Sequence, residues 1–390
     1  MTIALLGLFG CGNSGNDGSL ESMLNYLQAV LPTSPLICIC PAPAVISQRY
    51  AVPSISVGGS ELHGRIALVD RALAGLPRMT LGLAQIFIKL RGVKVLVIPG
   101  TGILDDFQET ASGWPFVLFR WCVAAKVLGI PIAFVSVGAG PIMHPLSRFL
   151  FKKSVKCASY ISYRDESSRK YMHEIGGNFI DDQCYPDLAF NLPTPSRSAS
   201  SERLTIVLGV MYYQGWKKSD SSGPSIYERY LGKLASYVTK LVNEGYRVRL
   251  ITGDVLDATA ISDLLSRLKP HTCDQVETCN TESLHAVMEA MMDATLVVAS
   301  RYHNVVCALM MGLPTISLSY NAKNDDLLER YNQREYRQHI ECFEVDILMN
   351  QTRNAIDNAP LIQSEINTEN KAVKDSAMQQ GEQILSVLSI

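Results

Sequence analysis

The sequence predicts an α/β protein with two domains, each built on a mostly parallel sheet with helices on both faces. Segments of strand length alternate with segments of helical periodicity through most of the chain. The alternation stops once, at residues 191–203, and then starts again. At 390 residues the chain also exceeds the size at which a single hydrophobic core keeps growing.

The first run of elements occupies residues 1–190 and predicts an N-terminal Rossmann-like domain. Its strands are short apolar runs, expected at Ile3 to Leu8, Leu36 to Cys40, Val93 to Ile98, Ile130 to Val137 and Tyr160 to Tyr163. Its helices have apolar residues at helical spacing, and are expected at Ser19 to Val30, Leu81 to Leu90, Pro115 to Leu128, Leu146 to Lys156 and Glu166 to Ile175. Such alternation is typical of a parallel sheet covered on both faces.

Residues 191–203, NLPTPSRSASSER, are rich in Pro and Ser and predict an interdomain linker. Residues 204–350 then predict a C-terminal Rossmann-like domain. Its expected strands are Leu204 to Met211, Val248 to Thr252, a short one near Val276, Thr295 to Ala299 and Thr315 to Ser319. Its expected helices are Ile226 to Asn243, Ala258 to Leu268, Glu282 to Met292 and Asn304 to Met311. Residues 351–390 form a tail whose amphipathic end, Ala377 to Leu388, predicts a helix packed back on the body.

Composition excludes several classes of function. Hydrophobic residues make up 47% of the chain and charged residues 18%, which excludes general disorder. The formal net charge of −2 gives no basic field for nucleic acid. Ten cysteines without a C-x-x-C pair indicate reduced thiols, with no zinc site or disulfide framework. The apolar N-terminus lacks a basic region and runs into a glycine-rich loop, so we expect a first strand and no signal peptide. No transmembrane helix is predicted, and we expect a cytoplasmic protein with at most peripheral membrane association.

The most informative segment is Thr295 to Lys323, which predicts a strand, a loop and a helix in succession. Ligands of open α/β sheets lie beyond the carboxyl ends of strands, where a helix N-terminus favours anions. Arg301 and His303 are two residues apart, so in an extended turn both would point into one pocket. Lys323 follows the next strand, which right-handed connectivity places beside the first. The alternative is that Arg301 pairs with a carboxylate and that His303 caps or packs.

Two loops in the first half also follow predicted strands. The glycine-asparagine loop contains Gly7, Gly10, Gly12, Gly15, Asn13, Asn16 and Asp17. It either lets a ligand approach the backbone or is a tight turn without a ligand. The loop from Gly100 to Asp106 ends in two adjacent carboxylates that point in different directions, so only one is expected to face a ligand. Solvated or helix-capping aspartates are the alternative there.

Two further groups remain ambiguous on the sequence alone. Arg164 follows the strand that ends at Tyr163, and it either binds an anion or makes an inward-facing salt bridge. Tyr212, Tyr213 and Trp216 follow the first strand of the second domain. Their rings either stack on a sugar or pack at a domain edge.

In their order along the chain, these motifs resemble the polysaccharide pyruvyl transferase family over about residues 3–330. They are the glycine-asparagine loop, G-x-G-Φ-Φ-x-D (Gly100 to Asp106), S-x-R-D-x-x-S (Ser162 to Ser168), P-D-x-A-F (Pro186 to Phe190), and R-x-H with Y-x-x-K (Arg301, His303, Tyr320, Lys323). The resemblance implies two Rossmann-like domains facing across a cleft, as in B-type glycosyltransferases. It also implies phosphoenolpyruvate as donor and a cyclic pyruvate ketal on a sugar as product. Two positions depart from the family pattern: Asn16, followed by Asp17, stands where an Asp is usual, and Thr101 stands where Gly is common.

The expected site follows from this chemistry. Phosphoenolpyruvate carries a carboxylate and a phosphate, which Arg301, Lys323 and Arg164 could bind. His303 would transfer a proton, and Asp106 would accept one from the sugar hydroxyl. Asn13, Asp17, Tyr212 and Trp216 are candidates for binding the acceptor, a sugar of a polysaccharide or of its lipid-linked precursor at the inner membrane face. No metal or cofactor is expected. The alternatives are a nucleotide-sugar glycosyltransferase of the same form and a sugar-binding subunit without chemistry.

Overall fold

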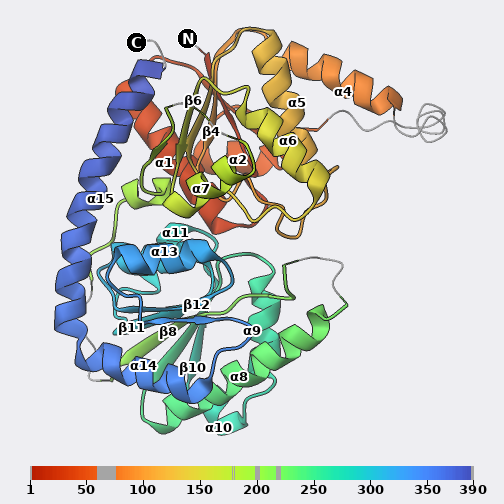
Figure 1. Ribbon diagram of the computed structural model, residues 1–390. Helices are drawn as coiled ribbons and strands as arrows, with labels where there is room; N and C mark the ends of the chain where they lie inside the picture. The colour runs from red at the N-terminus through yellow and green to blue at the C-terminus, as the bar shows by residue number, and fades with distance from the viewer. Residues whose placement is uncertain are drawn as a thin grey trace. The chain divides into compact units, whose positions relative to one another are not determined.

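Two parallel sheets form the framework of the chain in the computed structural model, which describes residues 2–58, 76–177, 179, 181–197, 203–216 and 221–387 (Figure 1). The first sheet has the order β3-β2-β1-β4-β5-β6-β7 and the second has the order β10-β9-β8-β11-β12-β13. Both contain the 3-2-1-4-5-6 order of the Rossmann fold, with the order reversing beside β1 and beside β8. The predicted pair of Rossmann-like domains is confirmed.

The strands are short and mostly buried, as parallel strands covered on both faces should be. Those of the first sheet are β1 (Thr2–Leu6), β2 (Leu36–Cys40), β3 (Ser54–Ser56), β4 (Val93–Pro99), β5 (Ile132–Val137), β6 (Tyr160–Tyr163) and β7 (Gln183–Cys184). Those of the second are β8 (Thr205–Gly209), β9 (Arg247–Ile251), β10 (Val276–Cys279), β11 (Leu296–Ala299), β12 (Thr315–Ser319) and β13 (Arg337–His339). The sequence did not indicate β3, β7 or β13, which are two or three residues long and carry no continuous apolar run.

The described helices of the first half are α1 (Ser14–Val30), α2 (Pro43–Tyr50), α4 (Leu76–Lys89), α5 (Trp114–Val127), α6 (Pro145–Val155), α7 (Glu166–Glu174) and the 3-10 helix η1 (Leu188–Asn191). Those of the second half are α8 (Gly223–Asn243), α9 (Asp257–Leu265), α10 (Pro270–Cys273), α11 (Leu284–Glu289), α12 (Tyr302–Met310), α13 (Ala322–Arg330), α14 (Val345–Asp357) and α15 (Ala359–Val387). In the second half, α11 and α13 lie on one side of the sheet and α8, α10 and α14 on the other (Figure 1).

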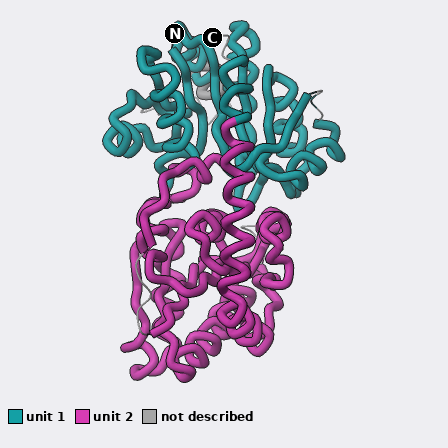
Figure 2. Tube along the Cα trace, turned by 90° about the vertical axis from the view of Figure 1, so that its left-hand side faces the viewer, with its two compact units in different colours: residues 1–11, 19–187, 379–390 teal, residues 12–18, 188–378 magenta. Residues whose placement is uncertain are grey.

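Contacts between residues divide the chain into two compact units, and each unit combines segments that are far apart in the sequence (Figure 2). Unit 1 contains Met1–Cys11, Ser19–Asp187 and Gln379–Ile390, and unit 2 contains Gly12–Gly18 and Leu188–Met378. The first turn of α1 therefore belongs to unit 2, and the last turns of α15 belong to unit 1. Part of the expected linker, residues 198–202, lies outside the described residues.

The last helix supplies a polar anchor to the core of unit 1. Gln380 is 2% exposed, and its amide nitrogen donates to the hydroxyls of Ser136 and Ser162 at 2.7 and 3.1 Å. Tyr26 of α1 donates its hydroxyl to the carbonyl of Gly381 at 2.6 Å. Burying an amide costs free energy unless its hydrogen bonds are made, so these contacts specify where the end of α15 lies.

Candidate functional site

The candidate site lies in unit 2, at the carboxyl edge of its sheet where the strand order reverses between β8 and β11. Three loops meet there, each following a different strand. Tyr212 follows β8, Gly253 follows β9, and Arg301 follows β11. This is the position where open α/β sheets place their ligands.

Arg301 is the N-cap residue of α12, and it forms a bidentate ion pair with Asp257. Nε of Arg301 donates to Oδ2 of Asp257 at 3.0 Å, and Nη2 donates to Oδ1 at 2.7 Å. Burial alone lowers the pKa of Arg301, but the charge and hydrogen bonds of Asp257 outweigh it, and the pKa is raised. The guanidinium therefore stays protonated. The pairing with a carboxylate that the sequence left open as an alternative is present.

Two glycines make room for the Arg301 and His303 side chains. A Cβ at Gly253 would lie 2.9 Å from Oδ1 of Asn304 and 3.0 Å from Cγ of Arg301. A Cβ at Gly15 would overlap the imidazole ring of His303. The sequence suggested that glycines in this loop let the backbone approach a ligand, and at position 15 the group that lies close to the backbone is the His303 ring.

The glycine-asparagine segment joins unit 2 through backbone and side-chain hydrogen bonds. The Ser14 N–H and hydroxyl both donate to the Gly253 carbonyl, at 3.2 and 2.9 Å, and the Val255 N–H donates to the Gly12 carbonyl at 3.0 Å. Asn13 caps α1, accepting from the N–H groups of Gly15 and Asn16, and its amide donates to Asp254 at 3.2 Å. The expectation that α1 begins at Ser19 is wrong because this cap starts the helix at Ser14. Asp17 lies in the first turn and is 3% exposed.

His303 is half-buried in the first turn of α12, and its ring meets that of Tyr302 edge-on at 5.2 Å between centroids. The expectation of an extended turn across residues 301–303 is wrong, because α12 begins at Tyr302. Arg301 is therefore the N-cap residue of α12 and His303 lies in its first turn, so strand alternation does not set the directions of their side chains.

Lys323 lies in the first turn of α13, after β12, and is 4% exposed. β12 pairs with β11 in parallel, as expected from right-handed connectivity. The next residue, Asn324, donates its amide to the Ser300 carbonyl at 2.9 Å and to the Ser317 hydroxyl at 3.2 Å. The start of α13 is thereby tied to the residue before Arg301.

The aromatic residues after β8 divide between two neighbourhoods. The ring of Tyr212 packs on Tyr227 of α8, with centroids 4.8 Å apart. Tyr213 and Trp216 instead pack near Tyr320, at 5.9 and 6.4 Å. Tyr320 also lies close enough to Arg301 to contribute to its raised pKa. Of Tyr212 and Trp216, the two aromatic candidates for acceptor binding, Trp216 is the one that packs near Tyr320.

Asp106 belongs to unit 1 and is 6% exposed. Its carboxylate accepts from the N–H of Met143 at 2.9 Å and from that of His144 at 2.8 Å, immediately before α6. Asp105 is more exposed, and its carboxylate accepts a long hydrogen bond, 3.3 Å, from the N–H of Phe107. The two neighbouring carboxylates do diverge. Asp106 has a structural role at this position besides the catalytic one predicted from the sequence.

The other unit 1 motifs connect to each other. Nη1 of Arg164 donates to Asp187 at 3.0 Å, and Nε lies 3.5 Å from Asp165, so this arginine makes the inward-facing salt bridges that the sequence left open.

Thr101 has a φ of 62°, in the left-handed region that a β-branched residue rarely adopts. This backbone conformation explains why glycine is common at that position of the motif.

Asp257 is the site residue that the sequence reasoning missed. It stands directly before the expected helix at Ala258, after the β9 strand, so the strand-end argument applied to the other loops would have found it.

No cluster of His, Cys, Asp or Glu suited to a metal ion occurs among the residues that the structure describes. Within the same part of the chain, no helix has both the length and the apolar character needed to cross a membrane.

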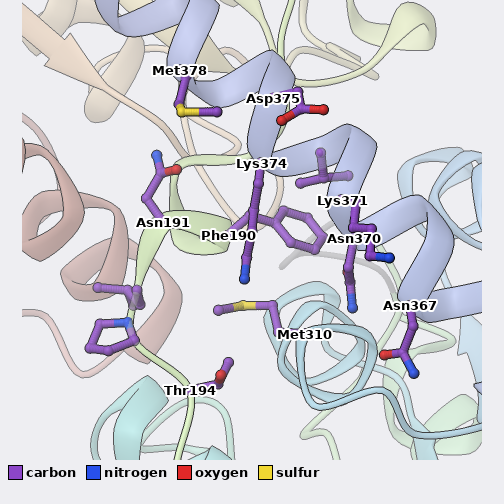
Figure 3. Close-up of a pocket in the computed structure, with 13 residues that line it drawn as sticks. Phe190, Asn191, Thr194, Met310, Asn367, Asn370, Lys371, Lys374, Asp375 and Met378 are labelled. Carbon is purple, nitrogen blue, oxygen red and sulfur yellow. The ribbon is translucent and has the colours of Figure 1, made fainter.

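A separate pocket of about 830 Å³ lies at the other end of α12, between the segment after η1 and α15 (Figure 3). Lys371, Lys374 and Asp375 lie on α15, with Phe190 and Met310 across from them. All three charged side chains are exposed, and they carry both signs. The pocket therefore has no arrangement that selects one kind of ligand.

Known proteins that resemble this chain indicate its family and its fold. A model for polysaccharide pyruvyl transferases matches residues 13–322. No curated protein sequence is significantly similar to the chain.

Similar solved structures include HepE from Anabaena in complex with UDP-glucose, with 12% identity, a TM-score of 0.63, and coverage of 100% of this chain and 99% of that one. UDP-GlcNAc 2-epimerase from Neisseria meningitidis bound to UDP-GlcNAc has 9% identity, a TM-score of 0.60, and coverage of 97% and 100%. A glycosyltransferase from Rickettsia africae has 10% identity, a TM-score of 0.60, and coverage of 99% and 97%. These likenesses confirm the predicted B-type glycosyltransferase fold.

Proposed function

The chain belongs to the polysaccharide pyruvyl transferase family, and from this premise we propose that it transfers pyruvate from phosphoenolpyruvate to a sugar as a cyclic ketal. The acceptor is a sugar of a polysaccharide or of its lipid-linked precursor. The observation that carries the proposal is the position of Arg301 and His303 at the start of α12, beyond the carboxyl end of β11. That position suits a small donor with two anionic groups.

The reaction needs two proton transfers. Protonation of the methylene carbon of phosphoenolpyruvate makes the adjacent carbon electrophilic, and a sugar hydroxyl attacks it. The carbon–oxygen bond to phosphate then breaks, and a second hydroxyl closes the ketal. The two hydroxyl protons are balanced by one new C–H bond and by the released hydrogen phosphate.

The proposed roles divide between charge and proton transfer. Lys323 and the N-terminus of α12 offset the donor's charge, and Arg301, paired with Asp257, binds one of its anionic groups. His303 protonates the carbon or the leaving phosphate. Asp106 is proposed as the base for the sugar hydroxyl, whereas Arg164 pairs with Asp165 and Asp187 and is left out of the proposed donor site. Asn13, Asp17, Tyr212 and Trp216 remain proposed acceptor contacts.

A thermal-shift panel distinguishes this function from its rivals. Phosphoenolpyruvate should raise the melting temperature, because a ligand that binds only the folded state stabilises it. The fold neighbours solved with UDP-glucose and UDP-GlcNAc make a nucleotide-sugar glycosyltransferase the second candidate. If UDP-sugars raise the melting temperature and phosphoenolpyruvate does not, that candidate is favoured. If glycans alone raise it, a sugar-binding subunit is favoured.

Replacing Arg301 by Ala should weaken phosphoenolpyruvate binding by about 2–5 kcal/mol, because a buried charge contact is lost. The change also leaves the buried carboxylate of Asp257 without its partner, which should lower the stability of the free protein by about 3–5 kcal/mol. Titration calorimetry should therefore be run at a temperature where the variant is folded. Parental affinity for phosphoenolpyruvate in the folded variant would contradict the anion-site assignment.

Replacing Asp106 by Asn should abolish ketal formation and leave phosphoenolpyruvate affinity nearly unchanged, because an amide cannot accept the hydroxyl proton. Some stability should also be lost, about 1 kcal/mol, because the amide N–H₂ cannot accept from the backbone N–H groups of Met143 and His144. Asp105→Asn is the matched control and should be mild in both respects. Turnover per folded molecule is the deciding quantity, and a parental value for Asp106→Asn would reduce Asp106 to a capping residue.

A further inference from the structure

We propose that Asp257 is a positioning residue of the donor site, which orients the guanidinium of Arg301 so that one defined edge meets the anionic donor. The proposal rests on the proposed function, because it assigns Asp257 to the site where phosphoenolpyruvate would bind.

The carboxylate of Asp257 is fully buried and makes four hydrogen bonds. Oδ2 accepts from Nε of Arg301 at 3.0 Å and from the N–H of Gly253 at 3.1 Å. Oδ1 accepts from Nη2 of Arg301 at 2.7 Å and from the N–H of Tyr212 at 2.9 Å. A carboxylate has about four acceptor positions, so its capacity is filled. A buried charge of this kind persists only where its pairing and hydrogen bonds are this complete.

These bonds select which edge of Arg301 can meet a ligand. The guanidinium has five N–H bonds in one plane, and Asp257 takes one from Nε and one from Nη2. One N–H of Nη1 points to the side of Cδ, and its remaining N–H lies with the second N–H of Nη2 along the neighbouring edge. That edge has the geometry for a bidentate contact with a carboxylate or a phosphate. The Arg301 side chain is 13% exposed, so it is mostly but not wholly enclosed.

Asp257 also connects the three loops of the site. Its partners come from the loop after β8 (Tyr212), the loop after β9 (Gly253) and the start of α12 (Arg301). Gly253 also leaves room for Arg301, because a Cβ at that position would lie only 3.0 Å from the Arg301 Cγ. A shift of the carboxylate would therefore move the guanidinium and the two loops together.

The Arg301–Asp257 pair carries no net charge. Asp257 therefore contributes by orienting Arg301, because the pair does not attract the donor by net charge. Arg301 with Asp257 contributes geometry, and the donor's charge is offset chiefly by Lys323 and the N-terminus of α12. The planar fork is essential to this role, whereas the ammonium of a lysine is a point charge with no fixed edge.

A double-mutant cycle with Asp257→Asn and Arg301→Ala tests the proposal, with phosphoenolpyruvate affinity measured by calorimetry on the full chain. Asp257→Asn alone should weaken binding by about 10- to 100-fold, and in the Arg301→Ala background it should have no further effect. Losses that multiply in the double variant would overturn the proposal, because Asp257 would then act independently of Arg301.

Two further variants keep the test decisive if Asp257→Asn folds poorly. Asp257→Glu keeps the charge but displaces the carboxylate, so it should fold and still bind phosphoenolpyruvate more weakly. Parental affinity in that variant would also overturn the proposal. The matched control is Asp293→Asn, which breaks another bidentate Arg–Asp pair, with Arg249, away from the site. It should lower the melting temperature and leave donor affinity unchanged.

Failure of the proposed function has a different signature. A parent protein that does not bind phosphoenolpyruvate overturns that donor, and the same cycle with UDP-glucose then decides whether Asp257 positions Arg301 for a different phosphate. Coupled losses with UDP-glucose would support the positioning role without the pyruvyl donor.

Discussion

Replacing His303 by Asn is expected to lower turnover by about 10²–10⁴-fold at saturating donor, the usual contribution of a general acid or base. Asn is polar and close in size to part of the ring, so the start of α12 should remain folded. It cannot gain or lose a proton near neutral pH, whereas imidazole can. The measurement is phosphate release together with ketal formation, with the donor above its KM.

His271→Asn is the control, because His271 is an exposed residue of α10. It should leave turnover and melting temperature unchanged. If His303→Asn also retained near-parental turnover, His303 would be a structural residue and the proton would have to come from another group.

Replacing Gly15 by Ala is expected to reduce turnover by about 10²-fold, the typical cost of misplacing a catalytic group by about 1 Å. The added methyl would overlap the His303 ring, so either the imidazole or the first turn of α1 must move. The helix itself should gain, since Ala is favoured over Gly in a helix by about 1 kcal/mol. Parental or only slightly altered helix content combined with low turnover is the expected signature, measured by circular dichroism and the ketal assay.

Gly232→Ala is the matched control, because Gly232 lies on α8 and an added Cβ there meets nothing within 4 Å. It should raise stability slightly and leave turnover unchanged. Normal turnover in Gly15→Ala would mean that the His303 ring can move aside without loss, and that its observed position is not required for chemistry.

The parts of the fold that could be predicted from the sequence are those with continuous apolar strands. β11 and β12 are buried along their whole length, and the sequence placed both to within a residue. β13, in contrast, consists of Arg337, Gln338 and His339, which have no apolar pattern, so its strand conformation depends on pairing with β12. Such short edge strands are determined by tertiary contacts.

The residues of the candidate site also differ in whether the sequence could predict them. Arg301 and His303 were predictable because they stand between a buried strand and a helix N-terminus, where parallel sheets bind anions. Asp257 was overlooked because an aspartate before a helix also reads as an ordinary helix start. The first turn of α1 was misplaced because its glycines suggested a loop, and the hydrogen bonds of Ser14 to Gly253 that hold it are made with a residue 239 positions away.

The route of the chain through its two units constrains the order of folding during synthesis. Unit 2 needs residues 12–18 and 188–378, all of which precede the end of α15. Unit 1 needs its first strand and also Gln380, which bonds to Ser136 and Ser162 in its core. A growing chain can therefore complete unit 2 first, while unit 1 waits for the last turns of α15 to leave the ribosome. Although the sheet of unit 1 is synthesised first, its core is completed only when the last turns of α15 are available.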